Sequence, residues 1–126
     1  MVTTTGSFSG FSVNDQAAAL AFYRDTLGLD VEDTGMGLDV AIPGGQHVFL
    51  YEKADHAPAT FTVLNLEVAD IDVAVDELVA AGVALERYAG MPQDEKGVMR
   101  GKAAGEGPDI AWFTDPAGNI LSVLNG

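Results

Sequence analysis

A twofold internal repeat constrains the fold of this chain more strongly than any other feature of its sequence. The segments Phe11–Asp15 and Leu66–Asp70 each contain a Val-x-Asp element, and the two elements lie 55 positions apart. Each element is followed by a stretch of helical periodicity that ends at a glycine. Neither half is long enough to be expected to fold alone. The repeat therefore predicts a single domain built from two modules, at about residues 6–56 and 60–126.

Within each module the pattern predicts a strand, a helix and three further strands. Asp15 is placed to cap the first helix, expected over residues 16–26, and either Asp70 or Asp72 is placed to cap the second. Alternating apolar residues predict the strands. The expected strands cover residues 7–13, 30–33, 37–42 and 47–53 in the first module, and residues 61–68, 84–89, 109–114 and 119–124 in the second.

A three-residue turn that begins with proline and ends with glycine occurs in each module and fixes how the strands on either side of it pair. The first turn places Asp39 opposite Phe49, and the second places Trp112 opposite Ser122. Because cross-strand partners share a face, one face of each sheet is aliphatic and packs under the helices. The other face combines polar and aromatic groups. On that face His47 lies diagonally near Asp39, so a His–Asp pair is expected.

The polar and aromatic face is the candidate ligand site. A dimer interface or an ordinary exposed face is the alternative, and each aromatic side chain is also open to a role in core packing. The expected ligand-binding residues on the strands are Phe8, Asp39, His47, Phe49, Tyr51, Phe61, Val63, Asn65, Glu67, Trp112 and Ser122.

The stretch between Gly90 and Pro108 has no counterpart in the first module. It contains five glycines and half of the six basic residues of the chain. A connector of this length is typical either of a solvated surface loop, with room for a short strand near Val98, or of a lid over a ligand. Met99 and Arg100, which lie on it, complete the expected ligand-binding set.

Charge excludes several classes of partner. The chain has 19 acidic and 6 basic residues and a formal net charge of −13, which disfavours binding to nucleic acid and to anionic membranes. The acidity serves solubility or attracts a cationic ligand. There is no cysteine, no signal-peptide pattern and no apolar run of the roughly 18 residues that a membrane span needs. We expect a cytoplasmic protein.

Taken in order, the motifs resemble the vicinal oxygen chelate superfamily, which includes glyoxalase I, extradiol dioxygenases and bleomycin-resistance proteins. The resemblance rests on the Val-x-Asp openings, on Ala-Phe-Tyr and Leu-Gly-Leu within residues 21–29, and on Asp-Pro-Ala-Gly-Asn at residues 115–119. It implies an α+β fold in which two βαβββ modules form a curved mixed sheet around a concave cleft, with the helices on the outer face. It also implies a homodimer.

In the metal-dependent members of that superfamily, four side chains bind one divalent ion. The positions that match them here are Phe8, Phe49, Val63 and Ser122. Divalent ions require oxygen or imidazole ligands, so this set does not suit a metal. The resemblance is therefore to the metal-free, drug-binding branch, and no cofactor is expected.

Three functions follow as hypotheses. The first is a protein that sequesters a hydrophobic or aromatic small molecule, with antibiotics as candidates, where Asp39 and Glu67 pair with a cationic group. The second is a lyase, isomerase or dioxygenase of the same superfamily that holds a divalent ion through substitutes such as His47, Asp39 and Glu67. The third is a metal-free acid–base enzyme that uses His47 or Glu67, although a lone histidine is more often structural.

Overall fold

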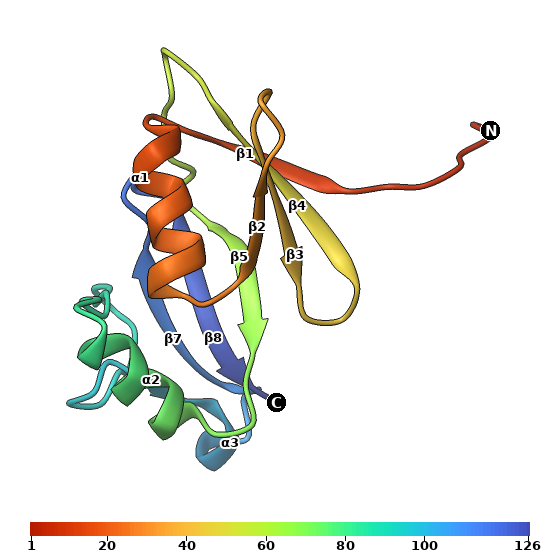
Figure 1. Cartoon of the computed structure of the whole chain (residues 1–126). Coiled ribbons are helices and arrows are strands. Elements are labelled where there is room, and N and C mark those ends of the chain that lie inside the picture. Colours follow the sequence, from red (N-terminus) through yellow and green to blue (C-terminus); the bar gives the residue numbers. More distant parts are fainter. The chain divides into compact units, whose positions relative to one another are not determined.

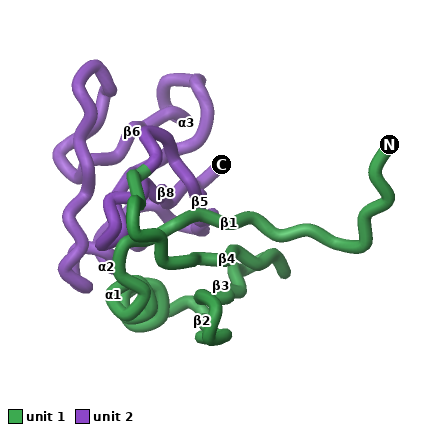
Figure 2. The backbone as a smooth tube through the Cα atoms, turned by 90° about the horizontal axis from the view of Figure 1, so that it is seen from above, with its two compact units in different colours: residues 1–58 green, residues 59–126 purple.

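The chain contains two compact units, which we call unit 1 (residues 1–58) and unit 2 (residues 59–126) (Figure 2). A computed structural model describes all residues from 1 to 126. Each unit has one four-stranded mixed sheet, in which one pair of strands is parallel and two pairs are antiparallel. The α+β class is therefore confirmed. Unit 1 has the predicted order of a strand, a helix and three strands, and unit 2 has this order with a short additional helix between its second and third strands. None of the helices has the length and apolar character that a bilayer-crossing helix requires.

Unit 1 has the strand order β1-β4-β3-β2, and its helical segment lies along one side of this sheet (Figure 1). Strand β1 runs parallel to β4, and the remaining neighbours are antiparallel. The elements are β1 (Ser9–Val13), α1 (Gln16–Ala21), η1 (Phe22–Thr26), β2 (Asp30–Asp33), β3 (Leu38–Ile42) and β4 (Gln46–Glu52).

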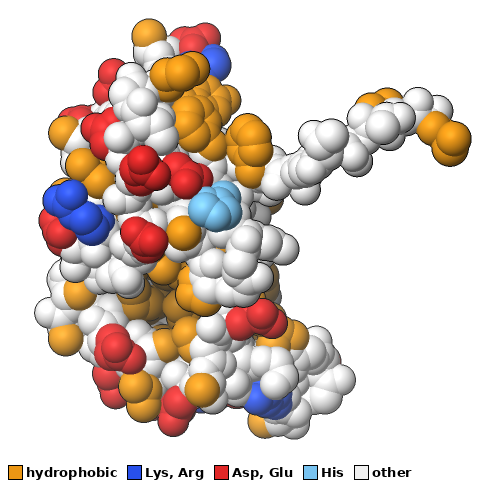
Figure 3. All heavy atoms as spheres, turned by 45° about the vertical axis from the view of Figure 1, so that its right-hand side comes forward, with side chains coloured by type: hydrophobic (Ala, Val, Ile, Leu, Met, Phe, Trp, Pro, Cys, Tyr) orange, Lys and Arg blue, Asp and Glu red, His pale blue; other side chains and the backbone are white.

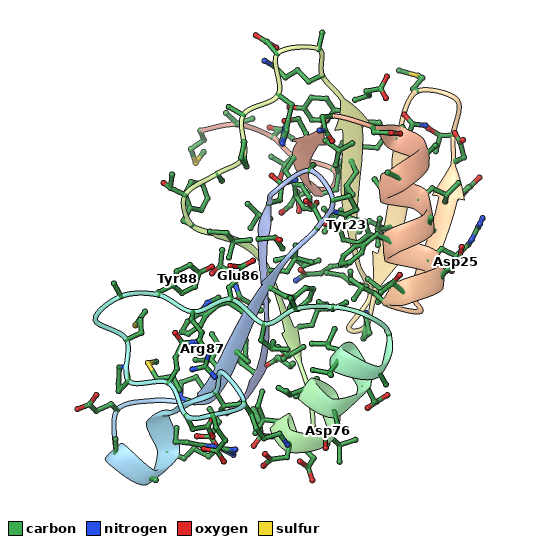
Figure 4. All side chains as sticks on the ribbon, turned by 90° about the vertical axis from the view of Figure 1, so that its left-hand side faces the viewer. Tyr23, Asp25, Asp76, Glu86, Arg87 and Tyr88 are labelled. Carbon is green, nitrogen blue, oxygen red and sulfur yellow. The ribbon has the colours of Figure 1, made fainter.

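The first helix starts at the predicted cap. The carboxylate of Asp15 accepts a hydrogen bond from the backbone N–H of Ala18 at 3.1 Å, which satisfies one of the donors that a helix start leaves unpaired. The helix continues through residues 22–26 with π geometry, a change of winding that the sequence pattern did not indicate. Tyr23 points inward from this segment and is fully buried, whereas Asp25 points outward (Figure 4).

Strand pairing in unit 1 follows the predicted register. Asp39 pairs with Phe49, and Val40 pairs with Val48. The aliphatic face is buried as expected, with Leu38 fully excluded from solvent. This burial leaves the opposite face of the sheet for polar and aromatic groups.

Unit 2 has the strand order β5-β8-β7-β6, in which β5 runs parallel to β8. The predicted pairing of Trp112 with Ser122 is confirmed, and Phe113 on the other face is fully buried. Asp70 caps the second helix by accepting hydrogen bonds from two backbone N–H groups. The elements are β5 (Thr62–Glu67), α2 (Ile71–Ala80), β6 (Met99–Arg100), α3 (Gly101–Ala104), β7 (Asp109–Thr114) and β8 (Ile120–Asn125).

The expected strand at residues 84–89 is wrong. This segment makes a single backbone hydrogen bond to β7, from Glu86 N–H to the Trp112 carbonyl, and the short strand β6 occupies the sheet edge instead. The side chain of Gln93 explains the difference, because it accepts from the Tyr88 N–H and donates to the Glu86 carbonyl. The Gln93 side chain thus forms hydrogen bonds with backbone groups that would otherwise pair with a neighbouring strand.

The connector between residues 90 and 108 is tied to helix α2 by ion pairs. Arg100 donates to both carboxylate oxygens of Asp72, at 2.8 and 3.1 Å, and to Asp94 at 2.9 Å. Lys96 lies 3.1 Å from Asp72 and 3.0 Å from Asp76. Two of the three basic residues of the connector, Lys96 and Arg100, therefore fix it against the first turns of α2.

This ion-pair cluster should make the contribution of Asp72 to stability depend on pH. The Arg100 and Lys96 side chains hold the pKa of the Asp72 carboxyl well below its usual range. A lowered folded-state pKa stabilises the protein above the unfolded-state pKa of about 3.9, and this stabilisation is lost as the pH falls further. We expect the difference in unfolding free energy between wild type and Asp72→Asn to be constant near neutrality and to shrink below about pH 4.

Urea unfolding at a series of pH values measures this difference. Asp76→Asn is the matched control, because Asp76 contacts Lys96 alone in the cluster and is more exposed than Asp72. Its effect should be smaller at every pH. If the difference in unfolding free energy between wild type and Asp72→Asn were the same at neutral and at acidic pH, the stabilisation assigned to the Asp72 carboxylate would be wrong.

Candidate functional site

The open face of the unit 1 sheet carries a row of aromatic side chains. The rings of Phe8 and Phe49 meet edge to face with centroids 6.4 Å apart, and Phe49 stacks with Tyr51 at 6.2 Å. Phe8 is 72% exposed, although large aromatic side chains usually bury most of their surface. The row therefore offers apolar surface and ring faces to a flat molecule.

Next to this row lies the His–Asp pair that the sequence predicted. The Nδ1 atom of His47 lies 3.0 Å from a carboxylate oxygen of Asp39, and both side chains are partly exposed. The carboxylate orients the imidazole ring, which is the arrangement that a general acid or base needs. The geometry is thus compatible with proton transfer at an open surface, or with simple surface pairing.

A second histidine contact was not anticipated. The Oγ atom of Ser12 lies 2.6 Å from Nδ1 of His56, and Ser12 pairs with Tyr51 in the sheet. His56 belongs to the turn that follows β4, so this contact joins the turn to strand β1. Ser12 shares the open face with its sheet partner Tyr51, but no local signal in the sequence links it to a residue 44 positions away.

Unit 2 contains a pocket of about 330 Å³ on the side of its sheet that the helices do not cover. Trp112 forms its most buried wall and is 7% exposed, and the ring of Tyr88 meets it edge to face at 5.7 Å. Ligand pockets commonly have volumes of about 300–1,000 Å³ and mostly apolar walls. The lining residues are Thr60, Phe61, Thr62, Tyr88, Met91, Trp112 and Ile120.

Two of the residues expected from the sequence, Phe61 and Trp112, line this pocket together. Ile120 was missed although strand parity could have found it, because it pairs with Thr114 on the same face as Ser122. Tyr88 was missed for a different reason, since it lies in the segment that was expected to be a strand.

The other expected residues of unit 2 lie nearby on the sheet but do not line the pocket. Ser122 is fully buried and donates a hydrogen bond to the side-chain oxygen of Asn65 at 2.6 Å. Val63 lies at an irregularity in the pairing of β5 with β8, and Glu67 is exposed near the end of β5. Ser122 therefore orients an amide within the sheet.

The two expected residues on β6 lie on opposite faces. Met99 pairs with Ile110 and shares the face of Trp112, because strand positions alternate between faces. Arg100 pairs with Asp109 on the helix-covered face, where its guanidinium group binds Asp72 and Asp94. Only Met99 is thus placed with the aromatic groups.

Acidic side chains are scattered over the molecular face in Figure 3, and basic ones are few. An acidic surface attracts cationic ligands and repels phosphates.

Figure 4 marks Glu86, Arg87 and Tyr88 on the segment that leads away from α2. Thr114 donates a long hydrogen bond of 3.5 Å to the Glu86 carboxylate.

The sequence model of the Glyoxalase/Bleomycin resistance protein/Dioxygenase superfamily matches residues 7–123. The chain belongs to this superfamily. None of the curated protein sequences matches the chain.

Several solved structures are similar to this chain over almost its whole length. A glyoxalase/bleomycin resistance protein from Streptomyces sp. CB03234 is 27% identical with a TM-score of 0.60, over 94% of this chain and 99% of that one. TnmS3, an antibiotic binding protein from the same organism, is 24% identical with a TM-score of 0.65, over 98% of both chains. A lactoylglutathione lyase from Agrobacterium tumefaciens is 21% identical with a TM-score of 0.65, over 98% of this chain and 95% of that one. The structures similar to this chain thus include one named as a binding protein and one named as an enzyme.

The residues present do not fit the divalent ion that metal-dependent members of the superfamily bind. The four matching positions hold Phe8, Phe49, Val63 and Ser122, of which the serine hydroxyl alone has an oxygen, and this hydroxyl is bound to Asn65. No group of three or more histidine and carboxylate side chains is arranged to hold a metal ion. A divalent ion needs several oxygen or nitrogen donors, so we derive no metal-dependent step.

Proposed function

We propose that this protein binds a flat hydrophobic or aromatic small molecule and holds it without a metal ion. The observation that carries the proposal is the unit 2 pocket, whose walls include the rings of Phe61, Tyr88 and Trp112. Aromatic walls stack against a conjugated ligand and remove apolar surface from water. The aromatic row of Phe8, Phe49 and Tyr51 in unit 1 belongs to the same proposal as a second stacking surface.

The net charge of the chain and the names of similar structures both narrow the class of ligand. The net charge of −13 raises the local concentration of a cationic ligand, and Asp39 and Glu67 offer carboxylates on the open faces of the two sheets. The names of two similar structures refer to bleomycin resistance and to antibiotic binding, which makes antibiotics the first candidates. We further propose that the protein is a cytoplasmic homodimer that sequesters its ligand. Arg100 is not proposed as a ligand-binding residue, because its guanidinium group binds Asp72 and Asp94.

Titration with acridine tests the proposal directly. Trp112 is the only tryptophan, so its emission reports on the pocket without interference from another indole. We expect saturable quenching at slightly alkaline pH, where acridine is uncharged. Phe61→Ala should weaken binding by about tenfold, since it removes one ring from the wall.

Phe61 is 67% exposed, so this variant should fold like the wild type. Val73→Ala is the matched control, because Val73 is another exposed apolar residue and does not line the pocket. Equal affinities of Phe61→Ala and Val73→Ala would refute the assignment of the pocket.

The alternative is a metal-dependent enzyme, and the lyase among the similar structures is the reason to test it. Protein purified without a histidine tag should contain no divalent metal in stoichiometric amount, and chelator treatment should leave acridine binding unchanged. A stoichiometric transition metal that is lost together with binding would favour the enzyme.

A further inference from the structure

Unit 2 contains a second pocket, which lies between helix α2, the segment that follows this helix and the connector. Its volume of about 570 Å³ exceeds the 330 Å³ of the pocket at Trp112 and falls within the usual range of small-molecule sites. The two pockets share no lining residue, so the proposed function leaves this one unexplained. We call it the α2 pocket, and its walls include Val75, Val79, Leu85, Arg87, Glu95 and Lys96.

The lining of the α2 pocket combines an aliphatic floor with a charged rim. Six of the ten lining residues are valine, alanine or leucine, and Val75 among them is 1% exposed. The other four are two acidic and two basic residues, so the lining is formally neutral although the whole chain carries a net charge of −13. A molecule with an apolar body and balanced charges therefore suits this pocket better than an anion, which the protein as a whole repels.

Polar contacts join the three segments around the α2 pocket. Lys96 on the connector lies 3.0 Å from Asp76 on α2. Arg87, on the segment after α2, donates from its Nη2 atom to the backbone carbonyl of Glu95 at 2.7 Å. Figure 4 marks Asp76 and Arg87 on the two segments that these contacts tie to the connector. The walls are thus preformed, which lowers the entropy lost when a ligand binds.

Two opposite charges at the rim have no charged partner in the chain. No carboxylate oxygen lies within 4.0 Å of the Arg87 guanidinium group, and no basic nitrogen lies that close to the Glu95 carboxylate. The other two rim charges, Lys96 and Asp76, pair with each other. Both Arg87 and Glu95 are exposed, so a dissolved molecule reaches them. The bond from Arg87 to the Glu95 carbonyl keeps the two residues adjacent, so a cation and an anion lie side by side at the mouth of an apolar pocket.

We propose that the α2 pocket binds a zwitterionic α-amino acid with an apolar side chain. The carboxylate of the amino acid accepts from the Arg87 N–H groups that the Glu95 carbonyl leaves unused, and its ammonium group donates to the Glu95 carboxylate. Its side chain packs against Val79 and Leu85. Both charges of an α-amino acid are attached to one carbon atom, so it needs opposite charges side by side, as Arg87 and Glu95 provide. This site goes beyond the proposed function and is independent of it.

Leucine and two of its fragments test the proposal. Isocaproate lacks the ammonium group of leucine and isoamylamine lacks its carboxylate, whereas the branched side chain is the same in all three. Isothermal titration calorimetry at neutral pH measures their affinities for the wild type, in about 0.15 M salt to screen the field of distant acidic residues. We expect leucine to bind at least about tenfold more tightly than either fragment, because it makes charge-assisted hydrogen bonds through both groups. Absence of saturable leucine binding, or equal binding of leucine and either fragment, would overturn the inference.

Two single variants assign the charges. Arg87→Gln should remove the advantage of leucine over isoamylamine, and Glu95→Gln should remove its advantage over isocaproate. Arg24→Gln and Glu77→Gln are the matched controls, since both residues are exposed and neither lines the pocket. A leucine affinity that Arg87→Gln leaves unchanged, or that the controls lower equally, would contradict the site.

Arg87→Lys separates the charge of the guanidinium group from its role in joining the walls. It retains the positive charge, so it should bind leucine more tightly than Arg87→Gln does. Equally weak binding by the two variants would mean that the charge at this position does not hold the ligand, and it would overturn the inference. Leucine should leave acridine binding at Trp112 unchanged. If acridine alone fails to bind, the proposed function is wrong and the α2 pocket is unaffected. If leucine alone fails to bind, this inference is wrong and the proposed function stands.

Discussion

Replacement of Asp115 with alanine is expected to lower the free energy of unfolding by roughly 3 kcal/mol. The Asp115 carboxylate is 4% exposed and accepts three hydrogen bonds, from the backbone N–H groups of Ala117 and Asn119 at 2.9 Å and from the Asn119 side chain at 3.0 Å. Alanine leaves these donors without their acceptor in a buried turn, and each such loss costs about 1–3 kcal/mol. Thermal unfolding should show a melting temperature lower by roughly 10–15 °C.

Asp33→Ala is the matched control for this variant. Asp33 also accepts a backbone N–H in a turn, from Gly35 at 2.9 Å, but it is exposed, so water replaces the lost bond. Its cost should stay below about 1 kcal/mol. Similar losses of unfolding free energy in the two variants would mean that burial does not strengthen the hydrogen bonds of the Asp115 turn.

The same substitution should disturb the pocket, because the Asp115 turn joins β7 to β8. The turn fixes the register in which Trp112 pairs with Ser122, and a slip by one residue would turn Trp112 to the helix-covered face. Acridine binding to folded Asp115→Ala should therefore be weaker than to the wild type, with the loss arising through the strands and not from a direct contact.

Strand register and facing were predictable from the sequence, since both depend on local rules. Side chains alternate strictly along a strand, and a short turn fixes which residues stand opposite each other. For this reason the pairing of Asp39 with Phe49, and the contact of Asp39 with His47, could be read from the chain alone. The caps at Asp15 and Asp70 follow from equally local chemistry.

The part of the pocket wall that Tyr88 forms was not predictable from the sequence. Its position depends on the Gln93 side chain, which binds the backbone where a neighbouring strand would otherwise pair. A strand was expected at residues 84–89 because the first module has one at the matching place, but Gln93 binds the backbone at Glu86 and Tyr88. A glutamine in a glycine-rich connector gives no sign of which backbone groups it will meet. Tyr88 and Met91 therefore entered the site only through the structure.

The placement of Arg100 illustrates a further limit. Its neighbour Met99 shares the open face with the aromatic groups, so the correct facing of Arg100 required the register of β6, which pairs with β7 through only two residues. The sequence shows basic residues gathered on a connector of an acidic protein. It does not show that Asp72 and Asp94 bind the guanidinium group of Arg100. Ion pairs between distant segments have no periodic signature that a sequence pattern could reveal.

Gly37→Ala should destabilise unit 1 by about 3 kcal/mol. A β-carbon at this buried position would lie 2.6 Å from the Leu50 carbonyl oxygen and 2.9 Å from Cε1 of Phe49, and it would come still closer to the Phe49 Cζ atom. The Leu50 carbonyl belongs to the backbone of β4, so relief of the clash requires the two strands to separate. The Phe49 ring would have to leave its position in the aromatic row. Chemical unfolding followed by circular dichroism measures the loss.

Gly6→Ala provides the reference, because a β-carbon at Gly6 meets no atom within 4 Å. The double variant Gly37→Ala/Phe49→Ala separates the two contacts. It removes the clash with the ring but keeps the clash with the Leu50 carbonyl, so the added cost of Gly37→Ala should be smaller in the Phe49→Ala background than in the wild type, without reaching zero. An equal cost in both backgrounds would mean that the ring adapts freely. In that case Phe49 would be a mobile member of the aromatic row, and its stacking with Tyr51 would not depend on the bare backbone at Gly37.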